Sequence, residues 1–160
     1  MDAQAVIDYD RFLDCWVKAA TGNPKAPVFV EMGLRWEDQL KRHMEAAGYK
    51  QLIRWGIVYY GDKPVGLHCY VTGKLPATML SRIMALKVVG MDDKYTPTEC
   101  LKLFPQGSVV CDPCVGKGCT PITAARLGHR FVGSELIPKR MMYTLGRLEK
   151  VMKMQAVKVG

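Results

Sequence analysis

Apolar residues in the first half of the chain recur at helical spacing in some stretches and at strand-like spacing in others. The pattern, with its glycine and proline breaks, predicts a helix at 8–20, a strand at 26–32, a helix at 36–47, and a hairpin of strands at 51–60 and 66–72 with its turn at 61–64. The residues expected to face the core are Phe12, Trp16 and Ala19 in the first helix and Trp36, Leu40, Met44 and Ala47 in the second.

After a short helix at 76–86 and a polar connection at 90–95, strand-like and helical stretches alternate regularly. The predicted elements are a helix from a capping box at 96–99 to about Leu103, a strand at 108–111, a helix at 121–127, a strand at 130–134 and a helix at 138–152. The last helix is expected to bury Met141, Leu145, Leu148 and Met152. Strand–helix–strand–helix order predicts a parallel sheet with right-handed crossovers, in a single α/β domain over residues 1–160.

The composition is that of an ordinary globular protein, with 49% hydrophobic and 24% charged residues. No stretch of about 18 apolar residues is present, so we expect no membrane-spanning segment. The acidic N-terminus does not resemble a secretory signal. Six cysteines in a chain long enough to form its own core are expected to be reduced thiols, as in a cytoplasmic protein.

The formal net charge is +8, and most of the excess lies near the C-terminus. The basic residues there are Lys139, Arg140, Arg147, Lys150, Lys153 and Lys158, against Glu149 alone. This pattern indicates either a polyanionic partner or a solvated basic helix face, and the charge alone does not decide between them.

The stretch from Cys111 to Pro121 follows an apolar strand and opens a helix. Gly116 and Gly118 remove side chains where a ligand would approach the backbone closely. Thr120 is a suitable N-cap and Pro121 a suitable first helical residue. The N–H groups at such a helix start can hold an anionic group, for example a carboxylate.

Two common glycine-rich loops fit this stretch poorly. A P-loop requires a glycine where Cys111 stands and a serine or threonine where Gly118 stands. A dinucleotide-binding loop requires a third glycine at the position of Pro121. The nearby thiols Cys111 and Cys114 could form a redox pair, but no second ligand pair completes a zinc site, so no metal is expected.

The stretch does resemble the Asp-Pro-Phe-x-Gly-x-Gly-Thr motif of DNA methyltransferases that modify exocyclic amino groups, with Cys114 in place of Phe and Cys119 inserted before Thr120. The resemblance continues through the strand at 130–134, which is followed by Glu135, and to the Arg147-Leu148 pair, and covers about residues 94–150. It implies a Rossmann-like methyltransferase sheet flanked by helices and a site for S-adenosylmethionine. The implied cofactor-binding residues are Asp112, Pro113, Cys114, Gly116, Lys117, Gly118, Thr120 and Glu135.

The spacing supports roles for two of these residues. Asp112 and Glu135 each follow a strand, so both are expected at the carboxyl edge of a parallel sheet, where such sheets bind ligands. Glu135 is predicted to accept hydrogen bonds from the ribose hydroxyls, and Asp112 to order the loop.

Residues 1–93 resemble, more loosely, a remnant of the catalytic half in the permuted subgroup of these enzymes, in which that half comes first. The chain contains no Asp-Pro-Pro-Tyr or related motif to hold a flipped base, and is expected to begin just after its position, so the catalytic residues are unknown and the sheet incomplete. We expect a bacterial or phage restriction-modification type of protein that binds DNA and self-associates or binds a partner chain. Three hypotheses remain: a methyltransferase completed by another chain or copy, a degenerate homologue with a regulatory role, or an enzyme that consumes S-adenosylmethionine without any nucleic acid.

Overall fold

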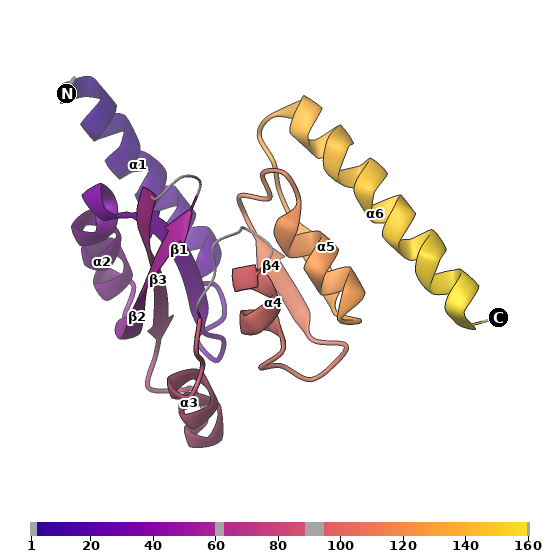
Figure 1. The fold of residues 1–160 in the computed structure, drawn as a ribbon. Helices are drawn as coiled ribbons and strands as arrows, with labels where there is room; N and C mark the ends of the chain where they lie inside the picture. Colours follow the sequence, from indigo (N-terminus) through magenta and orange to yellow (C-terminus); the bar gives the residue numbers. More distant parts are fainter. Residues whose placement is uncertain (1–2, 60–62, 89–94, 160) are drawn as a thin grey trace. The chain divides into compact units, whose positions relative to one another are not determined.

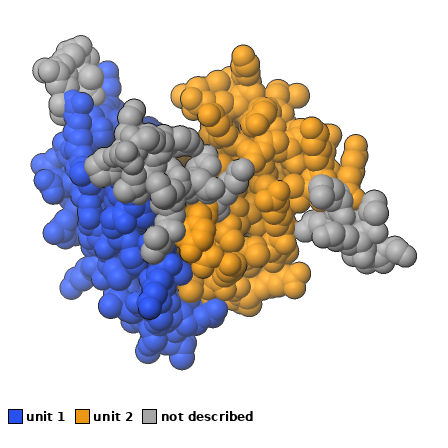
Figure 2. Space-filling view, in the orientation of Figure 1, with its two compact units in different colours: residues 1–91 blue, residues 92–160 orange. Residues whose placement is uncertain are grey.

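The computed structural model describes residues 3–59, 63–88 and 95–159, and the chain divides into two compact units (Figures 1 and 2). The N-terminal unit is residues 1–91 and the C-terminal unit residues 92–160. The N-terminal unit contains α1 (Ala3–Ala20), β1 (Val28–Gly33), the 3-10 turn η1 (Leu34–Trp36), α2 (Glu37–Ala46), β2 (Lys50–Tyr59), β3 (Lys63–Val71) and α3 (Ala77–Met84). The C-terminal unit contains α4 (Tyr95–Leu101), β4 (Val109–Asp112), α5 (Cys119–Arg126), β5 (Arg130–Gly133) and α6 (Pro138–Val159).

The N-terminal unit is built on an antiparallel sheet with strand order β1-β3-β2. Pairing of β2 with β3 confirms the predicted hairpin; its predicted turn at 61–64 falls partly outside the described residues. On β1 buried positions alternate with more accessible ones, so that Val28, Val30 and Met32 are buried, Phe29 is half-buried and Glu31 is exposed. This buried row packs with residues from α1 and α2 in one core cluster.

The predicted buried face of α1 is right only for Trp16, which is partly buried and packs against the core cluster. Leu13 and Val17 enter the core, whereas Phe12 is 46% exposed and Ala19 is exposed. Apolar residues occur on both neighbouring faces of this helix, and periodicity alone could not distinguish them. Contact with the β1 core cluster selects the face that carries Leu13 and Val17. In α2 the predicted Leu40 and Met44 are buried, and Ala47, just beyond the helix, is exposed.

The C-terminal unit contains a parallel pair of strands, β4 and β5, as the strand–helix alternation predicted. Helix α5 joins the two strands and contacts both of them as well as α4 and α6. Four consecutive residues of α5, from Pro121 to Ala124, are buried for this reason. Among the described residues, the β1-β3-β2 sheet and the β4-β5 pair are two separate sheets rather than one continuous sheet.

Two helix predictions in this unit need correction. Helix α4 starts at Tyr95, so Thr96 is a buried residue within the first turn and not a cap preceding the helix. In α6 the predicted Met141 and Leu148 are partly buried, but the predicted Leu145 and Met152 are 45% and 63% exposed, and Thr144 and Val151 complete the packed row. The buried Thr144 centres this row on a polar residue, which an apolar pattern cannot reveal.

None of the helices in the described ranges combines the length and apolar character needed to cross a membrane. Each unit consists of helices and one small β-sheet.

A polar cluster with one buried member, His68, lies between α2 and the sheet of the N-terminal unit. Arg54 donates from Nη2 to Oε1 of Glu37 at 2.8 Å, and from Nε to both carboxylate oxygens. His68 faces Arg54 in the strand register, is 1% exposed, and has Nε2 3.3 Å from Oε1 of Glu37. Neither ring nitrogen of His68 has a well-oriented hydrogen bond to any described residue. Gly66 is required beside them, because a Cβ there would collide with the Glu37 carboxylate.

Burial lowers the pKa of His68, and the neighbouring Glu37 carboxylate opposes this shift only in part. The imidazole is therefore neutral in the folded state at a pH at which the unfolded chain binds a proton. Because the unfolded state binds more protons, the free energy of unfolding must fall as the pH decreases below about 6.5.

We predict that His68→Gln weakens this pH dependence. In urea denaturation from about pH 7.5 to about pH 5.5, the wild-type protein should lose up to about 1.4 kcal/mol per pH unit through this residue. The variant should lose less over the same range, even if it is less stable at neutral pH. Parallel curves for the two proteins would show that His68 does not contribute.

Candidate cofactor site at the ends of β4 and β5

The parallel register places the C-terminal ends of β4 and β5 side by side. Asp112 pairs with Gly133, and the loops that follow these two residues leave the same edge of the sheet. Backbone hydrogen bonds join the two loops: Ser134 N–H donates to the Asp112 carbonyl at 3.1 Å, and Val115 N–H to the Ser134 carbonyl at 3.0 Å. The sequence-predicted residues 112–120 and Glu135 are therefore brought together at one edge.

Asp112 organises the first of these loops through its side chain. Its Oδ1 accepts a hydrogen bond from the backbone N–H of Cys114 at 2.8 Å, which forms an Asx turn directly after β4. The turn carries Pro113, whose carbonyl accepts a hydrogen bond from the Ser134 hydroxyl at 2.9 Å. The chain is thus turned back sharply toward the glycine residues that follow.

Glu135 connects the second loop to the first. Its Oε2 accepts the backbone N–H of Gly116 at 2.7 Å, and its Oε1 accepts that of Ile137 at 2.8 Å. The Ile137 N–H, with a smaller contribution from the Gly116 N–H, lowers the pKa of this carboxyl group. Glu135 is therefore an ionised, half-buried carboxylate held between two loops. Each of its oxygens still has capacity for a second hydrogen bond.

Glycine is needed at positions 116 and 118 for partly different structural reasons. Both have positive φ, +59° at Gly116 and +84° at Gly118. At Gly116 a Cβ would meet no atom closer than 3.9 Å, so the space beside it is open. At Gly118 a Cβ would lie 2.6 Å from the side chain of the buried Thr144, so α6 packs directly against that backbone.

The start of α5 differs from the prediction. Gly118 is the N-cap residue, the helix starts at Cys119, and Thr120 and Pro121 lie within its first turn. The left-handed conformation at Gly118 turns the chain into the helix earlier than a threonine cap would. Thr120 remains close to the loop but does not cap the helix.

Helix α6 supports the loop through two residues that sequence reasoning did not assign to the site. Arg147 donates from Nη1 to the Lys117 carbonyl at 2.6 Å, and its guanidinium lies 5.6 Å from the centre of the Tyr143 ring. Thr144, one turn earlier, packs against Gly118. Their three-residue spacing puts both on the face of α6 that meets the loop. The pattern of apolar positions in the sequence could not indicate this face, because neither residue is apolar.

Lys117, Cys111 and Cys114 are exposed at the loop, and Cys119 is half-buried. None of the six cysteines, all within the described residues, forms a disulfide bond. Among the described residues, no group of three or more histidine, cysteine or acidic side chains is arranged to hold a metal ion.

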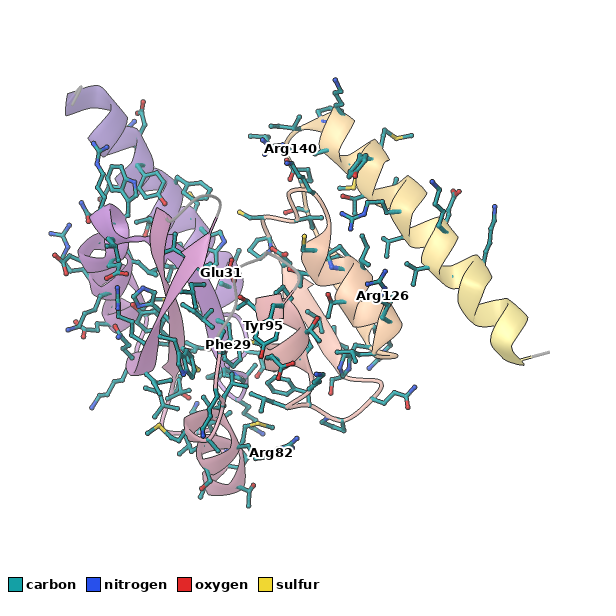
Figure 3. All side chains as sticks on the ribbon, in the orientation of Figure 1. Phe29, Glu31, Arg82, Tyr95, Arg126 and Arg140 are labelled. Carbon is teal, nitrogen blue, oxygen red and sulfur yellow. The ribbon has the colours of Figure 1, made fainter. Side chains whose placement is uncertain are left out.

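Figure 3 shows Arg126 at the end of α5 and Arg140 near the start of α6. Arg140 lies close enough to Glu135 to contribute to its lowered pKa. A separate surface depression occurs in the N-terminal unit, between the end of α2 and the start of β2, and it shares no residue with the glycine loop.

No known protein-family model matches the chain, and no curated protein matches its sequence. Solved structures do match its fold. M1.HpyAVI superimposes with a TM-score of 0.71 at 16% identity over 87% of this chain and 82% of its own length. TTHA0409 from Thermus thermophilus, assigned as a DNA modification methylase and solved with S-adenosyl-L-methionine, gives a TM-score of 0.72 at 18% identity, over 94% and 82% of the two chains.

The cytosine-N4-specific DNA methyltransferase PvuII gives a TM-score of 0.66 at 12% identity, over 89% of this chain and 74% of its own. These matches show that the chain has an α/β fold structurally similar to that of DNA amino-methyltransferases. At such low sequence identity they describe the fold alone.

The contrast between the two glycines gives a prediction. Gly116→Ala should cost about 1–2 kcal/mol of unfolding free energy, the strain of a left-handed alanine. Gly118→Ala should cost about 2–4 kcal/mol, because the new methyl group also collides with Thr144. Adding Thr144→Ala to Gly118→Ala should recover part of that loss in urea denaturation. Equal costs for the two glycine variants would contradict the packing of α6 against the loop.

Proposed function

We propose that this chain binds S-adenosylmethionine at the loop from Asp112 to Thr120 together with Glu135, as the cofactor-binding part of a DNA amino-methyltransferase. The observation that carries the proposal is the meeting of two parallel-strand ends. An open glycine backbone at Gly116 lies there beside a carboxylate that is kept ionised. A fold similar to that of TTHA0409, solved with S-adenosyl-L-methionine, supports the same assignment.

The residues of the loop fit the chemistry of this ligand. Glu135 has acceptor capacity left for ribose hydroxyls after its two backbone hydrogen bonds. The open space at Gly116 would accept the ligand near the backbone. The first turn of α5 would attract the carboxylate of the methionine portion, because the helix dipole favours an anion there. Asp112 would act by keeping the loop in shape.

When bound, the sulfonium of this ligand supplies an electrophilic methyl group. The protein then has mainly to position the attacking nitrogen and to exclude competing acceptors. The sequence contains no Asp-Pro-Pro or Asn-Pro-Pro segment that could hold an exocyclic amine. We therefore assign the acceptor-holding residues to another chain or a second copy, acting on DNA in the cytoplasm.

The sheets leave room for such completion. In the part of the chain that the structure describes, β4 and β5 pair only with each other, and β1 pairs only with β3. Val109 and Val132 of the parallel pair are 55% and 61% exposed. Open strand edges next to exposed apolar residues favour pairing with a further segment.

The lack of the amine-holding motif also favours a second function. A chain that binds the ligand but no flipped base would act as a regulatory or assembly module of a methylation system. The two functions share the cofactor site and differ only in whether a methyl group is transferred.

Isothermal calorimetry tests the cofactor site directly. We expect S-adenosylmethionine to bind, and Glu135→Ala to weaken binding about tenfold or more, as loss of a charge-assisted hydrogen-bond partner does. Glu99→Ala is a matched control in the same unit, because Glu99 forms an ion pair with the exposed Lys102 and its replacement changes the charge equally. No binding by the wild-type protein at millimolar ligand would refute the proposed site.

A methyl-transfer assay separates the two functions. With radiolabelled S-adenosylmethionine and duplex DNA, the methyltransferase hypothesis predicts incorporation that requires a partner chain or rises with protein concentration as copies associate. Incorporation should be lost in Glu135→Ala. Ligand binding without incorporation under any of these conditions would favour the regulatory module.

A further inference from the structure

Helix α6 carries most of the net charge of the protein. Its 22 residues include six lysines or arginines and one glutamate, a net charge of +5 within a chain of net +8. The basic residues are distributed along the helix rather than gathered at its C-terminal end, where the helix dipole would account for them.

The packed and exposed faces of α6 are chemically distinct. The packed row of Met141, Thr144, Leu148 and Val151 lies toward the rest of the C-terminal unit, and α6 contacts α5. The opposite face carries Lys139, Lys150 and Lys153, all exposed, together with Tyr143 at 57% and Met142 at 68% exposure. We call these five residues the basic face of α6.

The lysines of the basic face have no ion-pair partner among the described residues. Some lysines elsewhere are paired, such as Lys18 with Asp14 and Lys102 with Glu99, whereas others, such as Lys25 and Lys74, form no ion pair with a described residue. Glu149 is the one acidic residue of α6. It lies four residues before Lys153, a spacing that allows an ion pair, but no such pair forms among the described side chains. The positive charge of this face is therefore not neutralised within the described structure.

We propose that the basic face of α6 binds the phosphate backbone of double-stranded DNA. This inference rests on the proposed function for the choice of DNA as the polyanion. At a rise of 1.5 Å per residue, Lys139 and Lys150 lie about 16 Å apart, and Lys153 lies about one turn beyond. A DNA duplex carries one negative charge per about 1.7 Å of its axis, so each lysine has a phosphate within reach.

Other occupants fit the basic face less well. A helix that lies in a membrane surface buries a broad apolar face in lipid, whereas α6 packs its main row on its own unit and exposes Leu145 and Met152 beside its lysines. A second copy would bring like charges together. Tyr143 adds a polar ring that can donate to a phosphate oxygen without sequence preference, and its neighbour Arg147 is already held by the Lys117 carbonyl. The binding is therefore expected to be independent of base sequence.

Fluorescence anisotropy with a labelled duplex, measured without S-adenosylmethionine from about 50 mM to about 200 mM salt, tests the proposal. The combined Lys139→Gln, Lys150→Gln and Lys153→Gln variant should reduce the slope of log K against log salt by about 2.7, and Lys150→Gln alone by about 0.9. The matched control is Lys25→Gln, Lys74→Gln and Lys87→Gln, three exposed lysines of the N-terminal unit, and it should leave the slope unchanged.

Equal slope changes in the two triple variants would overturn the proposal, because they would show only a general effect of net charge. Wild-type binding to anionic vesicles but not to the duplex would overturn it in favour of a membrane surface. If the triple variant folds poorly, the smaller slope change of Lys150→Gln alone still tests the proposal. The DNA titration contains no S-adenosylmethionine, so its result does not depend on the cofactor proposal. Calorimetry with S-adenosylmethionine contains no DNA, so its result does not depend on the basic face of α6.

Discussion

The hydrogen bond from the Gly116 N–H to the Glu135 carboxylate, 2.7 Å long, is the contact on which the C-terminal unit depends. It joins the loop after β4 to the loop after β5, together with the backbone hydrogen bonds between these loops, so separation of the two strand ends would remove one charge-assisted hydrogen bond of the carboxylate. The same carboxylate accepts the Ile137 N–H and so guides the chain into α6. One side chain thereby sets the shape of the candidate site and the starting point of the basic helix.

The remaining support comes from the opposite side of the loop. Thr144 occupies the space that a side chain at Gly118 would need, and Arg147 holds the Lys117 carbonyl. The loop is therefore held by Glu135 at the Gly116 N–H and by α6 at Lys117 and Gly118, while the space beside Gly116, where a side chain would stand, is left open. A preorganised loop of this kind can bind a nucleoside without spending binding energy on ordering itself.

The N-terminal unit contributes a different kind of constraint. Glu37, Arg54 and His68 form a polar cluster on an antiparallel sheet, and Gly66 provides the room that they need. A buried histidine whose ring nitrogens lack well-oriented hydrogen bonds costs stability, so this sheet is more sensitive to acid than its apolar core would suggest. The similarity to methyltransferase structures extends over both units, since the match to TTHA0409 covers 94% of the chain.

The sequence by itself determined the order of helices and strands, the β2–β3 hairpin and the parallel β4–β5 pair, because periodicity and turn residues act locally. It also indicated that Asp112, Gly116, Gly118 and Glu135 would gather at one sheet edge, since parallel strands bring their carboxyl ends together. Tertiary structure alone decided which face of α1 is buried, that Gly118 rather than Thr120 caps α5, and that Thr144 and Arg147 support the loop. These outcomes depend on contacts between residues far apart in the chain, and a polar residue such as Thr144 leaves no mark in a pattern of apolar positions.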